Sequence, residues 1–294
     1  MQSRPFGRTG LEVPALGFGA MQVGDPALGE TQAARILNAA LDAGLTLIDT
    51  ARSYGLSEQR IGTHLARRRD EYVLSTKVGY GVEGIADWTY DCVMAGVDAA
   101  RDRLRTDTID IVHLHSCDRD RLARGEVTDA LLRCADQGKV RVIAYSGDAD
   151  ALALALASGS FGAVQVSVNV CDQEGIDVLQ SQGVENHGVI AKRPLAGRPW
   201  AMTSEPGDPT HAEYYRRFHR LREALAVETT DWEALALRFS AYADGVDCCL
   251  VGGSNIDHIH RNVEAAEKGP LPATERAALR DAFRIAGPSW RGLV

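Results

Sequence analysis

The sequence predicts an α/β fold, a closed (β/α)8 TIM barrel with an N-terminal β-hairpin and extra helices. Eight apolar segments of strand length alternate with segments of helical length along nearly the whole chain. Most strand segments are continuous apolar runs, which is typical of strands buried on both faces of a parallel sheet. Eight such units in roughly 250 residues favour a closed barrel over an open doubly wound sheet. We therefore expect residues 1–294 to form a single barrel domain.

The elements can be predicted in chain order. A hairpin around 7–10 leads into a first inner strand at 15–21. A helix follows within 30–44, where Ile36, Leu37, Ala40 and Leu41 share one face and Gly44 ends the helix. Further strands are expected at 45–49, 72–77, 109–115, 140–146, 163–169, 188–195 and 247–253. Further helices are expected at 57–69, 89–105, 127–137, 149–158, 173–182, 211–226, 231–243, 256–267 and 273–286.

The composition is ordinary for a soluble globular protein, with 45% hydrophobic and 24% charged residues. The net charge of −8 argues against nucleic acid as a partner, because phosphate binding needs a basic face. The first ten residues have no apolar core and no long apolar run follows, so we expect neither a signal peptide nor a membrane span. The six cysteines show no paired spacing, which indicates reduced thiols in a cytoplasmic protein.

Four residues with reactive side chains stand at or just beyond the ends of successive predicted strands: Asp49, Tyr54, Lys77 and His115. The C-terminal ends of parallel strands meet at one rim, so an acid, a phenol, an amine and an imidazole should converge there. Each residue alone could have a structural role, as a buried ion pair or a loop tyrosine. Together they favour an active site, because a tyrosine beside an ammonium group suits proton donation near neutral pH.

A glycine pattern beside this rim allows a different interpretation. Gly79, Gly81 and Gly84 match the G-x-G-x-x-G pattern of dinucleotide-binding folds. The last glycine does not open the next helix, whose expected N-cap is Asp87, and no strand ending in an acid follows at the required distance. A flexible glycine loop beside the active site is the favoured interpretation.

A histidine pair allows a third interpretation. His113 and His115 form an H-x-H motif on one face of a strand, as in zinc hydrolase barrels. The later strands end in Ser146, Asn169 and Gly253 rather than in further metal ligands. The sequence therefore disfavours a metal site, and His113 is expected to be a hydrogen-bonded interior histidine.

In several segments the chain resembles the aldo-keto reductase family. They are LGFGAM (16–21), LIDTARSYG-LSEQRIG (47–62), STKVG (75–79), DIVHLHSCD (110–118), GKVRVIAYSG (138–147), AVQVSVN (163–169), IAKRPLAG (190–197) and LVGGSNIDHIHRNV (250–263). These segments span nearly the whole chain in the family's order. The resemblance implies an NAD(P)H-dependent oxidoreductase that reduces an aldehyde or ketone to an alcohol, or catalyses the reverse reaction.

The resemblance also implies a role for each of the four rim residues. Tyr54 is the general acid, Lys77 favours release of its proton, and Asp49 pairs with Lys77. His115 orients and polarises the substrate carbonyl. Hydride passes from C4 of the nicotinamide to the carbonyl carbon. The expected partner is therefore a small carbonyl or alcohol substrate.

A cofactor site is implied along the same rim. Ser146 and Gln165 would bind the nicotinamide amide, and Asn262 would contact the adenine. The start of the helix after the last strand suits a phosphate, because its backbone amides are free to donate. The complete implied set is Gly19, Ala20, Met21, Asp49, Ser146, Gln165, Lys192, Arg193, Pro194, Leu195, Gly253, Ser254, Asn255, His258 and Asn262.

Several positions depart from the family's cofactor pattern. Gly147 stands where an asparagine usually binds the amide, and Lys192 or Arg193 stands where a tyrosine often stacks on the nicotinamide. His258 replaces the arginine that usually holds the 2′-phosphate, and Gly252 replaces a lysine. NADP(H) is the expected cofactor, with NAD(H) preference or dual use as the alternative.

The walls of the substrate pocket are expected from four segments, 22–29, 79–88, 196–212 and 287–294. Trp88, Trp200 and Trp290 lie in or beside these segments, where they could line an apolar pocket or pack a loop onto the barrel. Cys117 is given no catalytic role, because no neighbouring base is evident. A cofactor-binding regulatory or partner subunit with little turnover is the alternative function.

Overall fold

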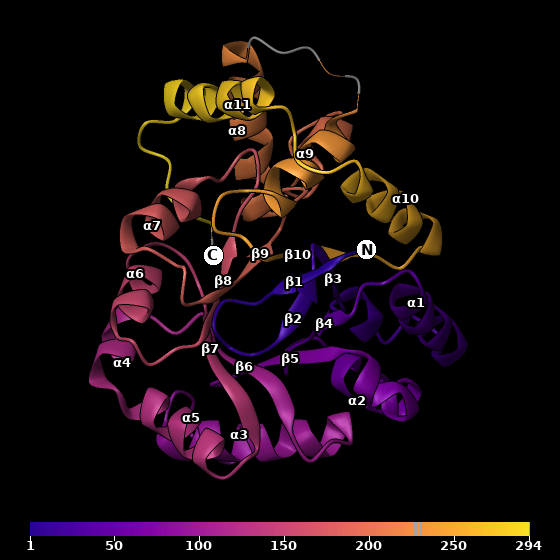
Figure 1. Ribbon diagram of the computed structural model, residues 1–294, viewed down its shortest axis with the longest axis vertical. Helices are drawn as coiled ribbons and strands as arrows, with labels where there is room; N and C mark the ends of the chain where they lie inside the picture. The colour runs from indigo at the N-terminus through magenta and orange to yellow at the C-terminus, as the bar shows by residue number, and fades with distance from the viewer. Residues whose placement is uncertain (226–228, 230, 294) are drawn as a thin grey trace.

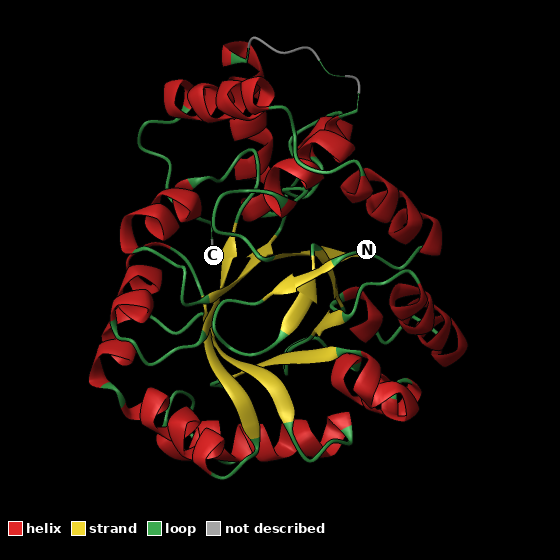
Figure 2. Cartoon of the chain, in the orientation of Figure 1, coloured by secondary structure: helices red, strands yellow, loops and turns green. Residues whose placement is uncertain are grey.

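The computed structural model describes residues 1–225, 229 and 231–293, and it contains a closed barrel of eight parallel strands surrounded by helices (Figures 1 and 2). Hydrogen-bonded neighbours run in the order β10-β3-β4-β5-β6-β7-β8-β9, so the predicted barrel is confirmed. The barrel strands are β3 (Leu16–Gly19), β4 (Leu47–Asp49), β5 (Val73–Val78), β6 (Ile109–His115), β7 (Val140–Ser146), β8 (Ala163–Ser167), β9 (Gly188–Lys192) and β10 (Cys248–Gly252).

The predicted N-terminal hairpin is confirmed as an antiparallel pair, β1 (Ser3–Pro5) and β2 (Glu12–Pro14). It lies across the barrel in Figure 1. The Arg4 guanidinium ties it to the backbone near β10 by donating to the carbonyls of Asp247 and Ala241. Phe6 is fully buried and packs with inward-facing residues of the strands, among them Leu47 and Ile111. The hairpin therefore closes the N-terminal end of the barrel, which we call the floor.

Helices form the outer layer, as the sequence predicts (Figure 2). The first of them, α1, buries the four predicted face residues, and Gly44 follows its end with a φ of +84°, a conformation that glycine adopts readily. None of the described helices has the length and apolar character needed to cross a membrane. The helices are α1 (Glu30–Asp42), α2 (Ser57–His64), α3 (Tyr90–Leu104), α4 (Arg119–Arg124), α5 (Glu126–Asp136), α6 (Ala149–Ala157), α7 (Glu174–Gln182), α8 (Pro209–Ala224), α9 (Trp232–Ala241), α10 (Ile256–Glu267) and α11 (Ala273–Ala286).

One predicted helix is wrong in its length. Instead of continuing over 57–69, α2 ends at His64, and a 3₁₀ segment, η2 (Ala66–Glu71), follows with a non-helical Arg68. The Arg68 guanidinium donates to Asn38 of α1, and Arg69 donates to Asp110 at the start of β6. These acceptors lie on other elements, so local helical periodicity could not predict the break. The predicted end of the helix over 211–226 lies outside the described residues.

Two details after β5 and β6 also differ from the prediction. The N-cap of α3 is Thr89, whose hydroxyl accepts from the Cys92 amide. Asp87 instead accepts from the Gly81 amide at 2.9 Å and so braces the preceding loop. The short helix α4 was not predicted; Asp118 caps its start and Gly125 ends it.

The barrel interior changes from apolar at the floor to polar at the opposite end, which we call the mouth. Alternate residues of a strand face inward, so β4 presents Leu47 near the floor and Asp49 at the mouth. On β6, Ile111 belongs to the floor cluster and His115 lines the mouth cavity. The register of the strands therefore collects the interior polar groups at the C-terminal ends, where barrel active sites lie.

Candidate functional site

A buried ion pair forms the base of the site. Lys77 of β5 is 1% exposed and Asp49 of β4 is 2% exposed, and Nζ of Lys77 lies 2.5 Å from Oδ2 of Asp49. The ammonium group also donates to the Thr50 carbonyl at 2.9 Å. Burial opposes the positive charge, but the Asp49 carboxylate and Tyr54 together outweigh that effect and raise the pKa of Lys77. Lys77 is therefore a fixed cation beneath the mouth.

Tyr54 stands above this pair in the turn that follows β4. Its backbone amide donates to the Ala51 carbonyl at 3.1 Å, and the Lys77 ammonium lies 5.0 Å from the centre of its ring. Gly24 permits the turn, because a Cβ at Gly24 would lie only 1.6 Å from the Tyr54 carbonyl oxygen. The phenol ring is thus held over the buried cation.

His115 completes the group of four. Its ring meets the Tyr54 ring edge-on, with the two ring centres 6.1 Å apart. Burial, reinforced by the Lys77 charge, lowers the pKa of His115 to about 3. The imidazole is therefore neutral near pH 7, and the structure brings Asp49, Tyr54, Lys77 and His115 to one place.

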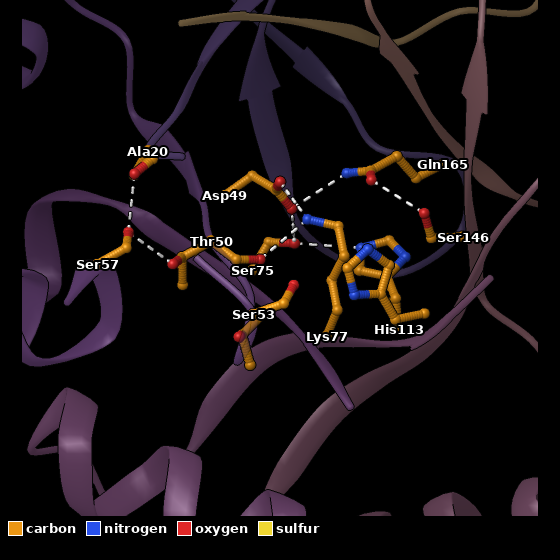
Figure 3. A network of polar contacts seen from close by, with 12 residues as sticks. Ala20, Asp49, Thr50, Ser53, Ser57, Ser75, Lys77, His113, Ser146 and Gln165 are labelled. Atoms are coloured by element: carbon orange, nitrogen blue, oxygen red, sulfur yellow. Dashed lines mark hydrogen bonds and ion pairs between the residues drawn. The ribbon is translucent and has the colours of Figure 1, made fainter. Parts of the chain in front are cut away.

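A chain of hydrogen bonds surrounds the ion pair (Figure 3). Oδ1 of Asp49 accepts from Ser75 at 2.8 Å and from the Gln165 amide at 3.1 Å, while Gln165 accepts from Ser146 at 3.0 Å. His113 is fully buried and its Nε2 lies 3.1 Å from Ser75 Oγ, whereas its Nδ1 has no partner among the described residues. Burial lowers the pKa of His113 to about 4, which keeps this interior histidine neutral.

The mouth holds a cavity of about 720 Å³. Tyr54 and His115 line it, whereas Lys77 is buried and does not. Most of the residues that the resemblance assigns to the cofactor also line it: Gly19, Met21, Asp49, Ser146, Gln165, Lys192, Arg193, Pro194 and Leu195. Within the described residues, the remaining members of that set do not line it: Ala20, Gly253, Ser254, Asn255, His258 and Asn262. The last five belong to α10 or to the loop before it.

The end of β9 carries two basic residues into the cavity wall. Nζ of Lys192 lies 3.0 Å from Oδ2 of the buried Asp148, which follows β7. Arg193 adopts a φ of +58° and donates to the Leu293 carbonyl at 2.7 Å, so the C-terminal segment is bound beside the cavity. Neither side chain is aromatic. The tyrosine that the resemblance would place here is therefore replaced by a basic residue.

Sequence reasoning did not identify several residues of the site. Asp148 could have been found, because it is an acid two residues beyond a predicted strand end. Arg198 and His211 line the cavity from the segment after β9. The segment 196–212 was predicted to form a wall of the pocket, but neither residue was singled out. The Tyr80 hydroxyl lies 2.8 Å from Nδ1 of His115. The glycine pattern around Tyr80 had indicated only a flexible loop.

The three tryptophans do not line the cavity. Trp200 packs against Phe218 and Trp232, and Trp290 packs against Phe283. Trp88 packs against Tyr80 instead. All three pack against the hydrophobic core, which agrees with the predicted packing role rather than with the lining of an apolar pocket.

The structure also bears on two other chemistries, a reactive Cys117 thiol and a metal site. Burial raises the pKa of the Cys117 thiol to about 12, so this cysteine stays protonated. Over residues 1–225, 229 and 231–293, no group of three or more His, Cys, Asp or Glu side chains is arranged to hold a metal ion.

Comparison with known proteins agrees with this geometry. The family model described as "Aldo/keto reductase family" matches residues 15–283. The chain is 29% identical to L-galactose dehydrogenase of Arabidopsis thaliana, over 98% of this chain and 95% of that protein. It is 29% identical to D-threo-aldose 1-dehydrogenase of a Pseudomonas species, over 95% of this chain and 97% of that protein. The holo form of an aldo-keto reductase from Bacillus halodurans superimposes with a TM-score of 0.82 at 29% identity, and 96% of each chain is covered.

Proposed function

The chain belongs to the aldo/keto reductase family, and on that premise we propose that it interconverts a small carbonyl compound and an alcohol with NADP(H). One observation carries this proposal. Tyr54 stands over the buried Lys77–Asp49 pair, beside a neutral His115, at the wall of a cavity of about 720 Å³. A proton donor, a fixed cation and a neutral hydrogen-bonding group are the parts that carbonyl reduction requires.

Each of the four side chains has a proposed task. Tyr54 gives its proton to the carbonyl oxygen, and the Lys77 ammonium stabilises the phenolate that remains. Asp49 keeps that ammonium charged and in place, since an unpaired buried lysine would lose its proton. Neutral His115 donates a hydrogen bond to the same carbonyl oxygen. When bound, the nicotinamide cofactor supplies the hydride.

The cavity residues fit a nicotinamide cofactor. Ser146 and Gln165 offer a hydroxyl and an amide to the nicotinamide carboxamide, and both are buried beside Asp49. Lys192, Arg193 and Arg198 place positive charge along the wall, which suits a diphosphate. We therefore propose these residues as cofactor contacts, together with the other cavity-lining members of the implied set.

The far end of the cofactor would reach α10. Asn255 caps this helix by accepting from the Asp257 amide at 2.9 Å. The proposed contacts to the adenosine are Asn255 and the nearby Gly253, Ser254, His258 and Asn262. In this proposal, the preference for NADP(H) over NAD(H) depends on His258. A cytoplasmic location is also proposed, since the cysteines at 92, 117, 134, 171, 248 and 249 are all buried free thiols.

The named relatives direct the choice of substrates. Two of them bear names of dehydrogenases that act on sugars, L-galactose and D-threo-aldoses. Asp208, Thr210 and His211 line the cavity with groups that can bind hydroxyls. We propose that the substrate is a small polar aldehyde or the corresponding sugar.

A substrate panel tests the proposal. Aldehydes and ketones would be assayed with NADPH and NADH, and aldoses with NADP⁺ and NAD⁺, by following the reduced cofactor. Turnover of a polar aldehyde or aldose is expected. Tight cofactor binding without turnover of any compound would instead favour a regulatory or partner subunit, while absence of both would remove the proposed function.

A further inference from the structure

The loop between β5 and α3 holds a tyrosine against the proposed carbonyl-binding histidine. The Tyr80 hydroxyl lies 2.8 Å from Nδ1 of His115, and the two rings stack at 25° with their centres 5.5 Å apart. The same hydroxyl lies 3.3 Å from Ser53 Oγ. Tyr80 therefore fixes both the plane of the imidazole and the environment of one of its nitrogens.

Several contacts brace the loop that carries Tyr80. The Trp88 amide donates to the Gly79 carbonyl at 2.7 Å, and the Trp88 ring packs against Tyr80 with ring centres 5.7 Å apart. Gly79 has a φ of +131°, and a Cβ there would lie 2.3 Å from the Trp88 ring. Arg52 and Asp87 bind the carbonyl and the amide of Gly81. These contacts account for Gly79, and a φ of +75° accounts for the other two glycines of the apparent dinucleotide motif, Gly81 and Gly84.

The protonation pattern of His115 follows from these contacts. A neutral imidazole carries one N–H, and the position of that proton depends on the hydrogen bond made by the other nitrogen. If the Tyr80 hydroxyl donates to Nδ1, the proton must be on Nε2. Within the described residues, Nε2 is the ring nitrogen without a protein partner, and His115 lines the cavity. Nε2–H would then be free to donate to a carbonyl oxygen, whereas an unprotonated Nε2 would repel it.

We propose that Tyr80 is a positioning residue, which holds His115 in the Nε2–H tautomer and aims that N–H at the substrate carbonyl. This inference rests on the proposed function for its catalytic consequence. Tyr80 acts through His115 and transfers no proton to the substrate. Its structural part, the tautomer, can be measured without any substrate.

Tyr80→Phe keeps the stacked ring and removes only the hydroxyl. We expect kcat for carbonyl reduction to fall about tenfold, while the Kd of the reduced cofactor stays within about twofold of wild type. Tyr90→Phe, which removes a hydroxyl at the start of α3, is the matched control and should keep kcat within about twofold. An equal loss in the control, or no loss in Tyr80→Phe, would contradict the inference.

Nuclear magnetic resonance of the protein labelled with ¹⁵N-histidine provides the second measurement. Long-range ¹H–¹⁵N correlations distinguish the two neutral tautomers, and His115→Gln identifies the His115 signal among the eight histidines. Wild type should show Nε2–H, and Tyr80→Phe should show a mixture of tautomers. Nδ1–H in wild type, or an unchanged tautomer in Tyr80→Phe, would overturn the inference. If no carbonyl compound is reduced, the proposed function fails, but this spectrum still decides whether Tyr80 sets the tautomer.

Discussion

The mouth and the floor of the barrel both bury a carboxylate beside basic residues, but they satisfy it differently. At the floor, Asp110 accepts from Arg69 at 2.7 Å, from Arg141 at 2.8 Å and from the Leu74 amide at 2.9 Å. Both arginines reach it from partly exposed positions. At the mouth, Asp49 pairs with a lysine that is itself fully buried, and that lysine lies under a phenol at a cavity wall. A floor carboxylate surrounded by fixed donors suits stability, whereas a buried cation beside a proton donor suits chemistry.

Two tyrosines provide the largest expected contrast between the ends. Tyr54→Phe removes the proposed proton donor, so turnover should fall by roughly 10²–10⁴ while cofactor affinity is retained. Tyr72→Phe at the floor removes a buried hydroxyl that has no partner among the described residues, and turnover should stay near wild type. Steady-state kinetics and cofactor titration of both variants measure this contrast. A Tyr54→Phe rate within threefold of wild type would exclude Tyr54 as the proton donor.

A second carboxylate on the mouth side, that of Asp172, has fewer partners. Its titration should make the stability of the protein depend on pH. Oδ2 of Asp172 accepts from the Leu293 amide at 2.9 Å, but Oδ1 has no partner among the described residues, and burial raises the pKa of Asp172 to about 7. An acid whose pKa is higher in the folded state than its unfolded value near 4 stabilises less as pH rises between those values. Stability from this group is therefore lost from about pH 4 to about pH 7.

Asp172→Asn should remove that loss. We expect the variant to exceed wild type in the free energy of unfolding by on the order of 3 kcal/mol at pH 8, and to match it near pH 4. Urea denaturation at a series of pH values gives the difference directly. A difference that does not change with pH would show that Asp172 does not titrate in this window.

Removing the floor carboxylate should affect stability but not catalysis. Asp110→Asn leaves two guanidinium groups without their anion, so the free energy of unfolding should fall by about 2 kcal/mol, less than for a fully buried pair because water reaches both arginines. The kcat should stay within about twofold. Asp49→Asn should instead lower kcat, because Lys77 loses the carboxylate that keeps it charged and in place. Equal losses of kcat in the two variants would contradict the proposal that only the mouth carboxylate serves catalysis.

The smallest expected effect concerns cofactor choice at the edge of the mouth. If His258 holds a 2′-phosphate, His258→Arg should strengthen NADPH binding by up to about tenfold, since a guanidinium can form two hydrogen bonds to a phosphate. NADH affinity should not change. Quenching of protein fluorescence would measure both affinities in wild type and variant. An unchanged NADPH affinity would place the 2′-phosphate elsewhere or remove the preference for NADP(H).

The two ends also differ in how far the sequence predicts them. The convergence of Asp49, Tyr54, Lys77 and His115 could be predicted, because each stands at a strand end and parallel strands bring their ends together. The break in the helix over 57–69 could not, because Arg69 is drawn to Asp110, a partner 41 residues away at the floor. Local sequence patterns predict which residues lie at strand ends, but they do not predict which long side chains form ion pairs with distant elements.

The parts of the mouth built by loops were less predictable than its strands. The contact between Tyr80 and His115 depends on a loop in which Trp88 takes a φ of +61°, a conformation that no sequence pattern signals for tryptophan. The Lys192–Asp148 pair joins the ends of two strands that are not adjacent in the barrel order. The closed barrel itself was predictable from the alternation of eight strand and helix segments, because most of the strand segments are continuous apolar runs.

Transfer of a labelled hydride tests most directly whether the mouth is the reducing end of this barrel. NADPH deuterated at the transferred C4 position would be incubated with a polar aldehyde and either wild type, Tyr54→Phe or Asp110→Asn, and the alcohol would be analysed by mass spectrometry. We expect deuterium on the carbinol carbon with wild type and with Asp110→Asn, and a rate lower by roughly 10²–10⁴ with Tyr54→Phe. Alcohol without deuterium, or equal rates with Tyr54→Phe and wild type, would contradict a carbonyl-reducing site built around Tyr54.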